Sequence, residues 1–337
     1  MKKRILYIGN NLSDETVNLT TVARLGGFLD KEGYSVIKSS SKKNKAIRLL
    51  DMWYCTFKAK KVVSYVLIDV YSTSNFWYAV STALICRLLK LPYIPILHGG
   101  KLPARVNKSP YWSAQLFENA LVNVAPSNFL LDSFRKAGFT QLTYIPNTIK
   151  LEKYNYKERS HPQPKLLWVR SFAEIYNPMM ALRILEELLK KYPKAQLCMV
   201  GPVKDDSFEK CSAYAKANNL PVTFTGRLSK SDWINLAVDY DIFINTTNFD
   251  NTPVSVIEAM ALGLPVVSTN VGGLSYLIES GVDGLLCNPN DISSFTSHVM
   301  QLIENPDLVQ KLANAAREKV TAFDWSVVRT KWLELLS

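Results

Sequence analysis

The stretch 245-NTTNFDNTPVSVIEAMALGLPVVSTNVGG-273 indicates the fold of the second half of this sequence. It predicts the end of a buried strand over 242–245, followed by a polar loop that contains Asp250. Thr252 is then expected to cap a helix whose first residue is Pro253. A glycine and a proline end this helix before the next apolar run. A strand, a helix and a second strand in this order are typical of a parallel sheet with crossover helices.

The beginning of this helix indicates a phosphate site. The first N–H groups of a helix have no intrahelical partner, and its N-terminus carries a partial positive charge. Glu258 lies one turn after Val254 on the same face of the helix. We therefore expect Glu258 to point back toward Asp250 at the carboxyl edge of the sheet.

The same alternation of strands and helices extends over both halves of the chain. Two doubly wound parallel sheets follow from it, and their default ligand site is a cleft at the carboxyl ends of the strands. Strands are predicted over 4–8, 62–70, 93–97, 120–125, 142–145, 165–169, 196–200, 222–225, 242–245 and 266–269. Helices are predicted over 20–31, 78–89, 128–137, 179–190, 208–217, 230–237 and 254–262.

The polar segment 151–164, which contains two prolines, predicts a linker between two domains. The N-terminal domain is expected over 1–150 and the C-terminal domain over 165–320. A helix is expected over 321–337, and packing against the N-terminal domain is one option for it.

Composition excludes several classes of protein. The longest apolar run, 76–86, is too short to cross a bilayer. The five cysteines form no CxxC pair, so a disulfide framework or a zinc site has little support and a reducing cytoplasm fits. The three histidines show no metal-binding spacing, and we expect no protein-held metal.

The net charge of +11 is carried entirely by the first half. Residues 1–150 contain 21 Lys and Arg against 8 Asp and Glu. One interpretation is a solvated basic surface; the other is attraction to an anionic membrane or to a phosphate-bearing acceptor. The basic cluster Lys42, Lys43, Lys45 and Arg48 lies among apolar residues, which favours the second. No nucleic-acid-binding motif accompanies the charge, so nucleic acid is not an expected partner.

The quoted stretch resembles the signature of the retaining GT-B glycosyltransferases of family 4. In that family, two acidic residues eight positions apart are followed by EAMAxGxPVV, here Asp250 and Glu258 with EAMALGLPVV. Other family landmarks occur in the same order along the chain: HGG at 98–100, APSNF at 125–129, IPN at 145–147, VGP at 200–202, FTGRLS at 224–229 and GVDGLL at 281–286.

The resemblance implies roles for individual residues. Asp250 would contact the donor sugar, Arg170 would stabilise the leaving diphosphate, and His98 would face the donor sugar from the N-terminal domain. Glu258 would bind the ribose hydroxyls. The remaining donor-binding residues would be the backbone of Asn251, Thr252, Pro253 and Val254, together with Gly201, Gly226 and Arg227.

The resemblance also implies a GT-B fold of two Rossmann-like domains that face a central cleft. The activity would be metal-independent, retaining transfer of a hexosyl or N-acetylhexosaminyl group from a UDP- or GDP-sugar, with no other cofactor. The acceptor would be a sugar, a polysaccharide or a lipid-linked sugar in bacterial cell-surface polysaccharide or glycolipid assembly. The expected location is the cytoplasm, with the inner face of the membrane as an option.

Three positions depart from the family pattern. Asp250 stands where Glu is usual, and a lysine expected five to seven residues after Arg170 is replaced by Tyr176 and Asn177. The usual glycine-rich loop after the first strand is replaced by 9–16. Two alternatives therefore stay open: a GT-B sugar-nucleotide epimerase, and a non-catalytic sugar-nucleotide-binding partner of an active transferase.

Overall fold

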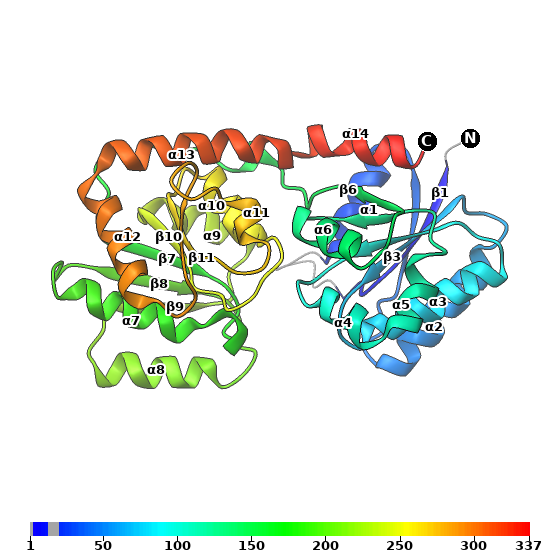
Figure 1. Cartoon of the computed structure of the whole chain (residues 1–337), viewed down its shortest axis with the longest axis horizontal. Coiled ribbons are helices and arrows are strands. Elements are labelled where there is room, and N and C mark those ends of the chain that lie inside the picture. Colours follow the sequence, from blue (N-terminus) through cyan, green and yellow to red (C-terminus); the bar gives the residue numbers. More distant parts are fainter. Residues whose placement is uncertain (1–2, 13–19) are drawn as a thin grey trace. The chain divides into compact units, whose positions relative to one another are not determined.

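The chain folds into two compact units, each built on a parallel sheet of six strands (Figure 1). The computed structural model describes residues 3–12 and 20–337. The first unit comprises Met1–Pro146 and Trp332–Ser337, and the second comprises Asn147–Lys331. The predicted α/β class, with two doubly wound parallel sheets, is confirmed.

The first unit carries its strands in the order β2-β1-β3-β4-β5-β6. The order changes direction between β1 and β3, which is the switch point of a doubly wound sheet. The strands are β1 (Arg4–Ile8), β2 (Ser35–Ser39), β3 (Tyr65–Val70), β4 (Tyr93–Leu97), β5 (Asn123–Ala125) and β6 (Leu142–Tyr144). The helices are α1 (Thr21–Lys31), α2 (Lys45–Ala59), α3 (Asn75–Leu88), α4 (Leu102–Lys108), α5 (Pro110–Phe117) and α6 (Asn128–Lys136).

Short polar side chains begin several of these helices. Asn44 Oδ1 accepts hydrogen bonds from the N–H groups of Ala46 and Ile47, at 2.9 and 3.2 Å, where α2 starts. Ser127 Oγ accepts from Leu130 N at 3.1 Å where α6 starts. Each cap satisfies N–H groups that the helix itself leaves without a partner.

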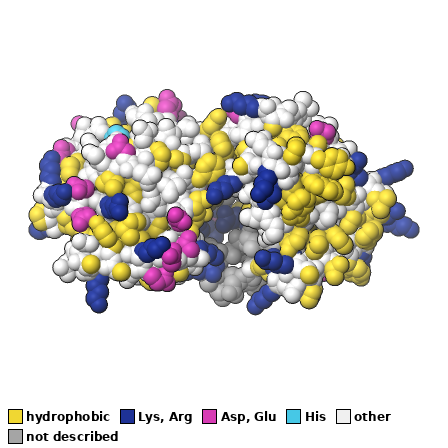
Figure 2. Space-filling view, turned by 60° about the horizontal axis from the view of Figure 1, so that its bottom comes forward, with side chains coloured by type: hydrophobic (Ala, Val, Ile, Leu, Met, Phe, Trp, Pro, Cys, Tyr) yellow, Lys and Arg dark blue, Asp and Glu magenta, His cyan; other side chains and the backbone are white. Residues whose placement is uncertain are grey.

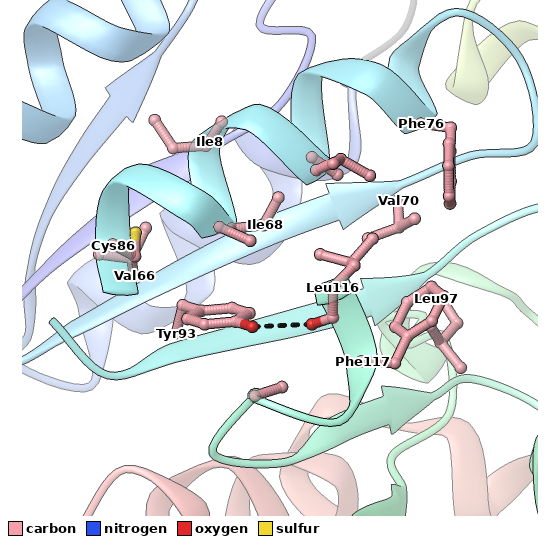
Figure 3. Packing of buried hydrophobic residues seen from close by; sticks show 14 of the residues in the cluster. Ile8, Val66, Ile68, Val70, Phe76, Cys86, Tyr93, Leu97, Leu116 and Phe117 are labelled. Carbon is pink, nitrogen blue, oxygen red and sulfur yellow. Dashed lines mark hydrogen bonds between the residues drawn. The ribbon is translucent and has the colours of Figure 1, made fainter. Parts of the chain in front are cut away.

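Apolar side chains from the sheet and from α3 and α5 form the core of the first unit (Figure 3). Phe76 and Cys86 come from α3, and both are fully buried. Tyr93, at the start of β4, is buried as well, and its hydroxyl donates to the carbonyl of Leu116 at 2.8 Å. A buried hydroxyl needs such a partner, so this contact fixes α5 against the sheet.

The second unit carries its strands in the order β12-β11-β10-β7-β8-β9. The strands are β7 (Lys165–Val169), β8 (Gln196–Val200), β9 (Val222–Gly226), β10 (Ile242–Asn245), β11 (Val266–Thr269) and β12 (Leu285–Cys287). The α-helices are α7 (Pro178–Leu189), α8 (Ser207–Ala217), α9 (Lys230–Leu236), α10 (Val254–Ala261), α11 (Leu274–Leu277), α12 (Ile292–Glu304), α13 (Pro306–Val320) and α14 (Trp325–Leu335). Short 3₁₀ turns lie at Leu151–Lys153, Glu174–Tyr176, Ala237–Asp239 and Thr321–Phe323.

The last residues of α14 belong to the first unit. Lys3 Nζ donates to the carbonyl of Leu336 at 3.0 Å, and the Tyr65 hydroxyl donates to the carbonyl of Ser337 at 3.1 Å. The end of the chain is therefore bonded to β1 and β3 through their flanking side chains. No helix in the described part of the chain has the length and apolar character needed to cross a membrane.

The predicted strands agree best with the structure, while several helices were missed. Six strands have the predicted limits: 4–8, 93–97, 165–169, 196–200, 242–245 and 266–269. β3 begins later than predicted, because the N–H groups of Val62 and Val63 bond to the carbonyl of Ala59 in the turn after α2. The prediction missed α2 and β2, which both expose a large share of their residues.

Candidate active site

The loop between β10 and α10 forms the centre of the site in the second unit. The helix begins at Val254, and Pro253 is its N-cap. The carbonyl of Pro253 accepts the first helical hydrogen bond, from Val256 N at 3.1 Å. The prediction that Thr252 caps the helix and Pro253 is its first residue is therefore wrong by one position. Because Pro253 has an extended backbone, with ψ at 117°, it cannot be part of the helix.

Two glycines at the end of the quoted stretch hold this loop in place. Gly273 N donates to the carbonyl of Asp250 at 3.0 Å. A Cβ at Gly273 would overlap the carbonyl oxygen of Asn251, and a Cβ at Gly272 would overlap that of Asp250. Gly272 also has φ at +54°, a value that favours glycine. The close approach of two backbones thus sets the position of Asp250 and Asn251.

We expect Gly273→Ala to lower the melting temperature and to weaken nucleotide-sugar binding, because the loop must move to admit the methyl group. Gly27→Ala is the matched control. Gly27 lies inside α1 with no atom within 4 Å of the added Cβ, so alanine should keep or raise stability there. Thermal unfolding and donor titration of both variants check this. Equal melting temperatures and donor affinities for the two would contradict the role of Gly273.

Arg170 and Asp250 form an ion pair between Nη2 and Oδ2. Arg170 directly follows β7, and the structure brings these two predicted catalytic residues together. Burial lowers the pKa of Arg170 to about 10, against the opposing effect of Tyr176. Arg170 Nε is buried without a hydrogen-bonding partner among the described residues. Asn251 N donates to Asp250 Oδ1 at 2.8 Å, so the carboxylate is held from both sides.

Tyr176 and Asn177 occupy the region in which the family pattern has a lysine, and both contribute to the surroundings of Arg170. The guanidinium of Arg170 lies over the ring of Tyr176, with 4.7 Å from Cζ to the ring centroid. Asn177 adopts the left-handed conformation, with φ at +46°. Its Nδ2 donates to the side-chain oxygens of Asn248 and Asn290, at 3.2 and 2.9 Å. Tyr176 therefore orients the arginine, and Asn177 ties its loop to the loop after β10.

Glu258 is almost fully buried, at 2% exposure, and belongs to a second pair of charges. Its Oε1 accepts from Lys230 Nζ at 2.5 Å and from the Tyr154 hydroxyl at 2.7 Å. Sequence reasoning missed both partners. Lys230 directly follows the FTGRLS landmark, which could have indicated it. Tyr154 lies in 151–164, the segment expected as a linker, but it is buried in the core of the second unit.

The strand ends of β7, β8 and β9 meet at three of the predicted positions. Gly201 N donates to the carbonyl of Gly226 at 2.9 Å. A Cβ at Gly201 would overlap the carbonyl oxygen of Arg170, so glycine allows these strand ends to approach. Arg227, which follows Gly226, is exposed. At this edge of the sheet, Gly201 and the hydrogen-bonded Gly226 therefore lie next to the backbone of Arg170.

His98 lies in the first unit, directly after β4. Its Nε2 is 2.9 Å from Asp69 Oδ1, which also accepts from the Tyr7 hydroxyl at 2.9 Å. Since an ionised carboxylate only accepts hydrogen bonds, Nε2 carries the proton. The ring of Tyr71 stacks on His98, at 5.0 Å between centroids. Asp69, Tyr7 and Tyr71, which the sequence analysis did not single out, fix the orientation and tautomer of His98.

The segment that replaces the glycine-rich loop is described only in part. Gly9 lies close to β3: a Cβ at Gly9 would be 2.8 Å from Asp69 Oδ2. Asn10 Oδ1 accepts from Arg48 Nη1 at 3.0 Å. Residues 13–16 of this segment lie outside the described residues. Over residues 3–12 and 20–337, no group of three or more His, Cys, Asp and Glu side chains could hold a metal ion.

Two relatives with assigned activities match parts of the chain. The sulfoquinovosyl transferase SQD2 of Arabidopsis thaliana is 29% identical over 156 residues, which are 45% of this chain and 29% of that protein. The N,N'-diacetylbacillosaminyl-diphospho-undecaprenol alpha-1,3-N-acetylgalactosaminyltransferase of Campylobacter jejuni is 25% identical over 171 residues, 51% of this chain and 42% of that protein. The chain thus spans less than half the length of these two relatives.

A solved structure and a family model also match the chain. The crystal structure of HepE from Anabaena in complex with UDP has a TM-score of 0.76, covers 100% of this chain and 99% of its own, and is 16% identical. Residues 152–319, which form most of the second unit and contain Arg170, Asp250 and Glu258, match the model of the glycosyl transferases group 1. The matched region, 152–319, is therefore a glycosyl transferases group 1 domain, and the chain has the GT-B fold.

Proposed function

We propose that the chain is a retaining glycosyltransferase of family 4 that moves a hexosyl or N-acetylhexosaminyl group from a UDP- or GDP-sugar to an acceptor. The observation that carries the proposal is the contact of Arg170 with Asp250 beside the N-terminus of α10. When the bond from the sugar to the diphosphate breaks, both bonding electrons leave with the diphosphate. Positive charge and N–H donors placed in advance stabilise such a leaving group.

The donor would be held by the two pairs of charges in the second unit. Arg170 and the backbone of Asn251 to Val254 would bind the diphosphate, with Gly201 beside them. Asp250 would contact the sugar. With the donor bound, the guanidinium of Arg170 would contact phosphate oxygens as well as the Asp250 carboxylate. No metal is needed in this scheme, because a cation and a helix terminus supply the charge.

Glu258 would bind the ribose hydroxyls. Lys230 and Tyr154 keep its carboxylate oriented in a buried place, and the Lys230 side chain is 36% exposed, so the pair reaches the surface of the unit. Gly226 and Arg227 would lie along the base. A buried carboxylate is a strong and directional acceptor for hydroxyl groups.

His98 would face the donor sugar from the first unit, and the acceptor would be a sugar, a polysaccharide or a lipid-linked sugar. The Campylobacter relative, whose name includes diphospho-undecaprenol, supports a lipid-linked acceptor. The setting would be bacterial cell-surface polysaccharide or glycolipid assembly in the cytoplasm, at the inner face of the membrane.

The test is a screen of UDP-, GDP- and ADP-sugars with the purified chain. We expect one UDP- or GDP-sugar to bind and to be hydrolysed slowly, with an anomeric configuration retained in the released sugar by NMR. Hydrolysis should persist in excess EDTA. Loss of activity with EDTA that Mg²⁺ or Mn²⁺ restores would contradict the metal-independent scheme.

Other results of the screen separate the alternatives. Conversion of the free donor to its epimer would identify an epimerase. Tight binding without turnover would identify a non-catalytic partner, for which the replacement of the family lysine by Asn177 is the motivating observation. Binding of none of these donors would contradict the proposed function.

A further inference from the structure

The first unit exposes a group of large apolar side chains on three neighbouring helices. Burial of such side chains is the rule, and a large contiguous apolar patch on a folded unit marks an interaction site. We call this surface the apolar face. It consists of nine exposed residues on α2, α3 and α5: Ile47, Leu50, Tyr54, Phe57, Trp77, Leu84, Leu88, Tyr111 and Trp112.

Helix α2 has apolar residues on two opposite sides. Met52 and Ala59 lie on the buried side and pack in the core. Leu50 and Tyr54 lie on the other side and are 58% and 62% exposed. The exposed positions 47, 50, 54 and 57 follow the spacing of three and four residues that places side chains on one helical face. One stripe of α2 therefore serves the core, and the other is left for a partner outside the unit.

Contacts between the helices make the face continuous. Helix α2 packs beside α3, where Trp53 Nε1 donates to Ser81 Oγ at 3.1 Å. Helix α3 packs beside α5, where the rings of Trp77 and Trp112 meet edge to face with 6.0 Å between centroids. Figure 2 shows the hydrophobic side chains gathered over the right-hand unit, which is the first one. The exposed stripes of the three helices thus join into one surface.

Basic side chains accompany the apolar face. Residues 42–121 contain twelve Lys and Arg against three Asp and Glu. Of the three acidic residues, Asp69 is buried beside His98, Asp51 in the middle of α2 accepts from Ser39 Oγ, and Glu118 after α5 is exposed. Exposed lysines stand at both ends of α2, at 43, 45, 58, 60 and 61. Arg48, grouped with the basic cluster in the sequence analysis, is in fact buried.

We propose that the apolar face docks on the surface of an anionic lipid bilayer. Trp and Tyr side chains favour the boundary between lipid headgroups and acyl chains, while Lys side chains extend toward anionic headgroups. A second copy of the chain would bring the same basic margin against itself, and like charges would repel. This docking adds a place of contact to the proposed function, and its test needs no sugar transfer.

The experiment measures co-sedimentation of the full chain with vesicles of phosphatidylcholine alone and with 30% phosphatidylglycerol. We expect binding to the anionic vesicles, weakening as salt rises. The variant Leu50→Ser/Tyr54→Ser/Phe57→Ser should lower the partition coefficient at least tenfold, because the apolar stripe of α2 is lost. Lys58→Glu/Lys60→Glu/Lys61→Glu should lower it similarly on anionic vesicles.

A matched control removes exposed apolar side chains from the second unit. Val238→Ser/Val282→Ser/Val327→Ser changes residues that are 41–48% exposed and should leave vesicle binding unchanged. Equal loss in the control and in the α2 variant would overturn the assignment of the face. Donor binding in the absence of vesicles should be the same for all these variants, so a failed lipid test is distinct from a failed glycosyltransferase proposal.

A second measurement uses the native chain, so it does not depend on the folding of a variant. Lipids brominated on their acyl chains should quench part of the tryptophan fluorescence in anionic vesicles, and Trp77→Phe/Trp112→Phe should remove most of that quenching. Absence of quenching in the native chain would overturn the proposal. The proposal would also be overturned if light scattering showed a dimer of the native chain that the α2 substitutions dissociate, and if the native chain bound neither kind of vesicle.

Discussion

Arg170→Ala should lower the rate of sugar transfer by about 10²–10³-fold, the usual effect of removing one preorganised donor from a site that stabilises developing negative charge. Tyr176 stacks on this guanidinium and stands where the family pattern resembled by the sequence has a lysine, so Arg170 would carry a larger share of the charge. Arg170→Lys should retain a little activity, because a point charge remains but the planar fork is lost. Single-turnover rates with saturating donor measure this loss.

The ion pair with Asp250 calls for a structural control. Arg170→Ala leaves a largely buried carboxylate without its cation, which destabilises the unit by itself. In Arg170→Ala/Asp250→Ala the unpaired charge is gone, so the melting temperature should recover while transfer stays low. Transfer at near the native rate in Arg170→Ala would show that another group holds the phosphates.

Glu258→Gln should weaken donor binding by roughly tenfold to a hundredfold, because hydrogen bonds to a charged acceptor are worth about 1.5–3 kcal/mol. The substitution keeps the shape of the side chain, removes its charge and replaces one acceptor oxygen by an NH₂ donor. Lys230 would lose the negative charge beside it, but its side chain is exposed enough to be solvated. Calorimetric titration with the nucleoside diphosphate and with its sugar measures the change.

Two variants separate the charge of Glu258 from its surroundings. Glu187→Gln breaks another Glu–Lys pair, with Lys190 on the exposed side of α7, and should leave affinity unchanged. Tyr154→Phe removes one hydrogen bond to Glu258 but keeps its charge, so its effect should be smaller than that of Glu258→Gln. If Glu258→Gln binds the nucleotide as tightly as the native chain, Glu258 is a structural residue of α10.

The two parallel sheets could be predicted from the sequence, and the sequence also assigned the proposed site to the loop after the strand at 242–245. Strands such as 165–169 and 242–245 are short apolar runs buried on both faces, and such runs depend little on their neighbours. Asp250, Glu258 and the pair Gly272 and Gly273 also lie close together in the sequence, all within thirty residues after the strand at 242–245. Chemistry that arises from a strand, a loop and the next helix can be predicted because covalent connection keeps the parts together.

Which side chains meet across the sheet depends on how the whole chain folds. Tyr154 and Lys230 are 104 and 28 residues away from Glu258 along the chain, and Asp69 is 29 residues away from His98. No local pattern joins such residues, because strand order and burial bring them together. The same holds for the apolar face: the residues of 45–59 are divided between core and exterior by the neighbours of α2, and periodicity alone cannot tell which stripe is buried.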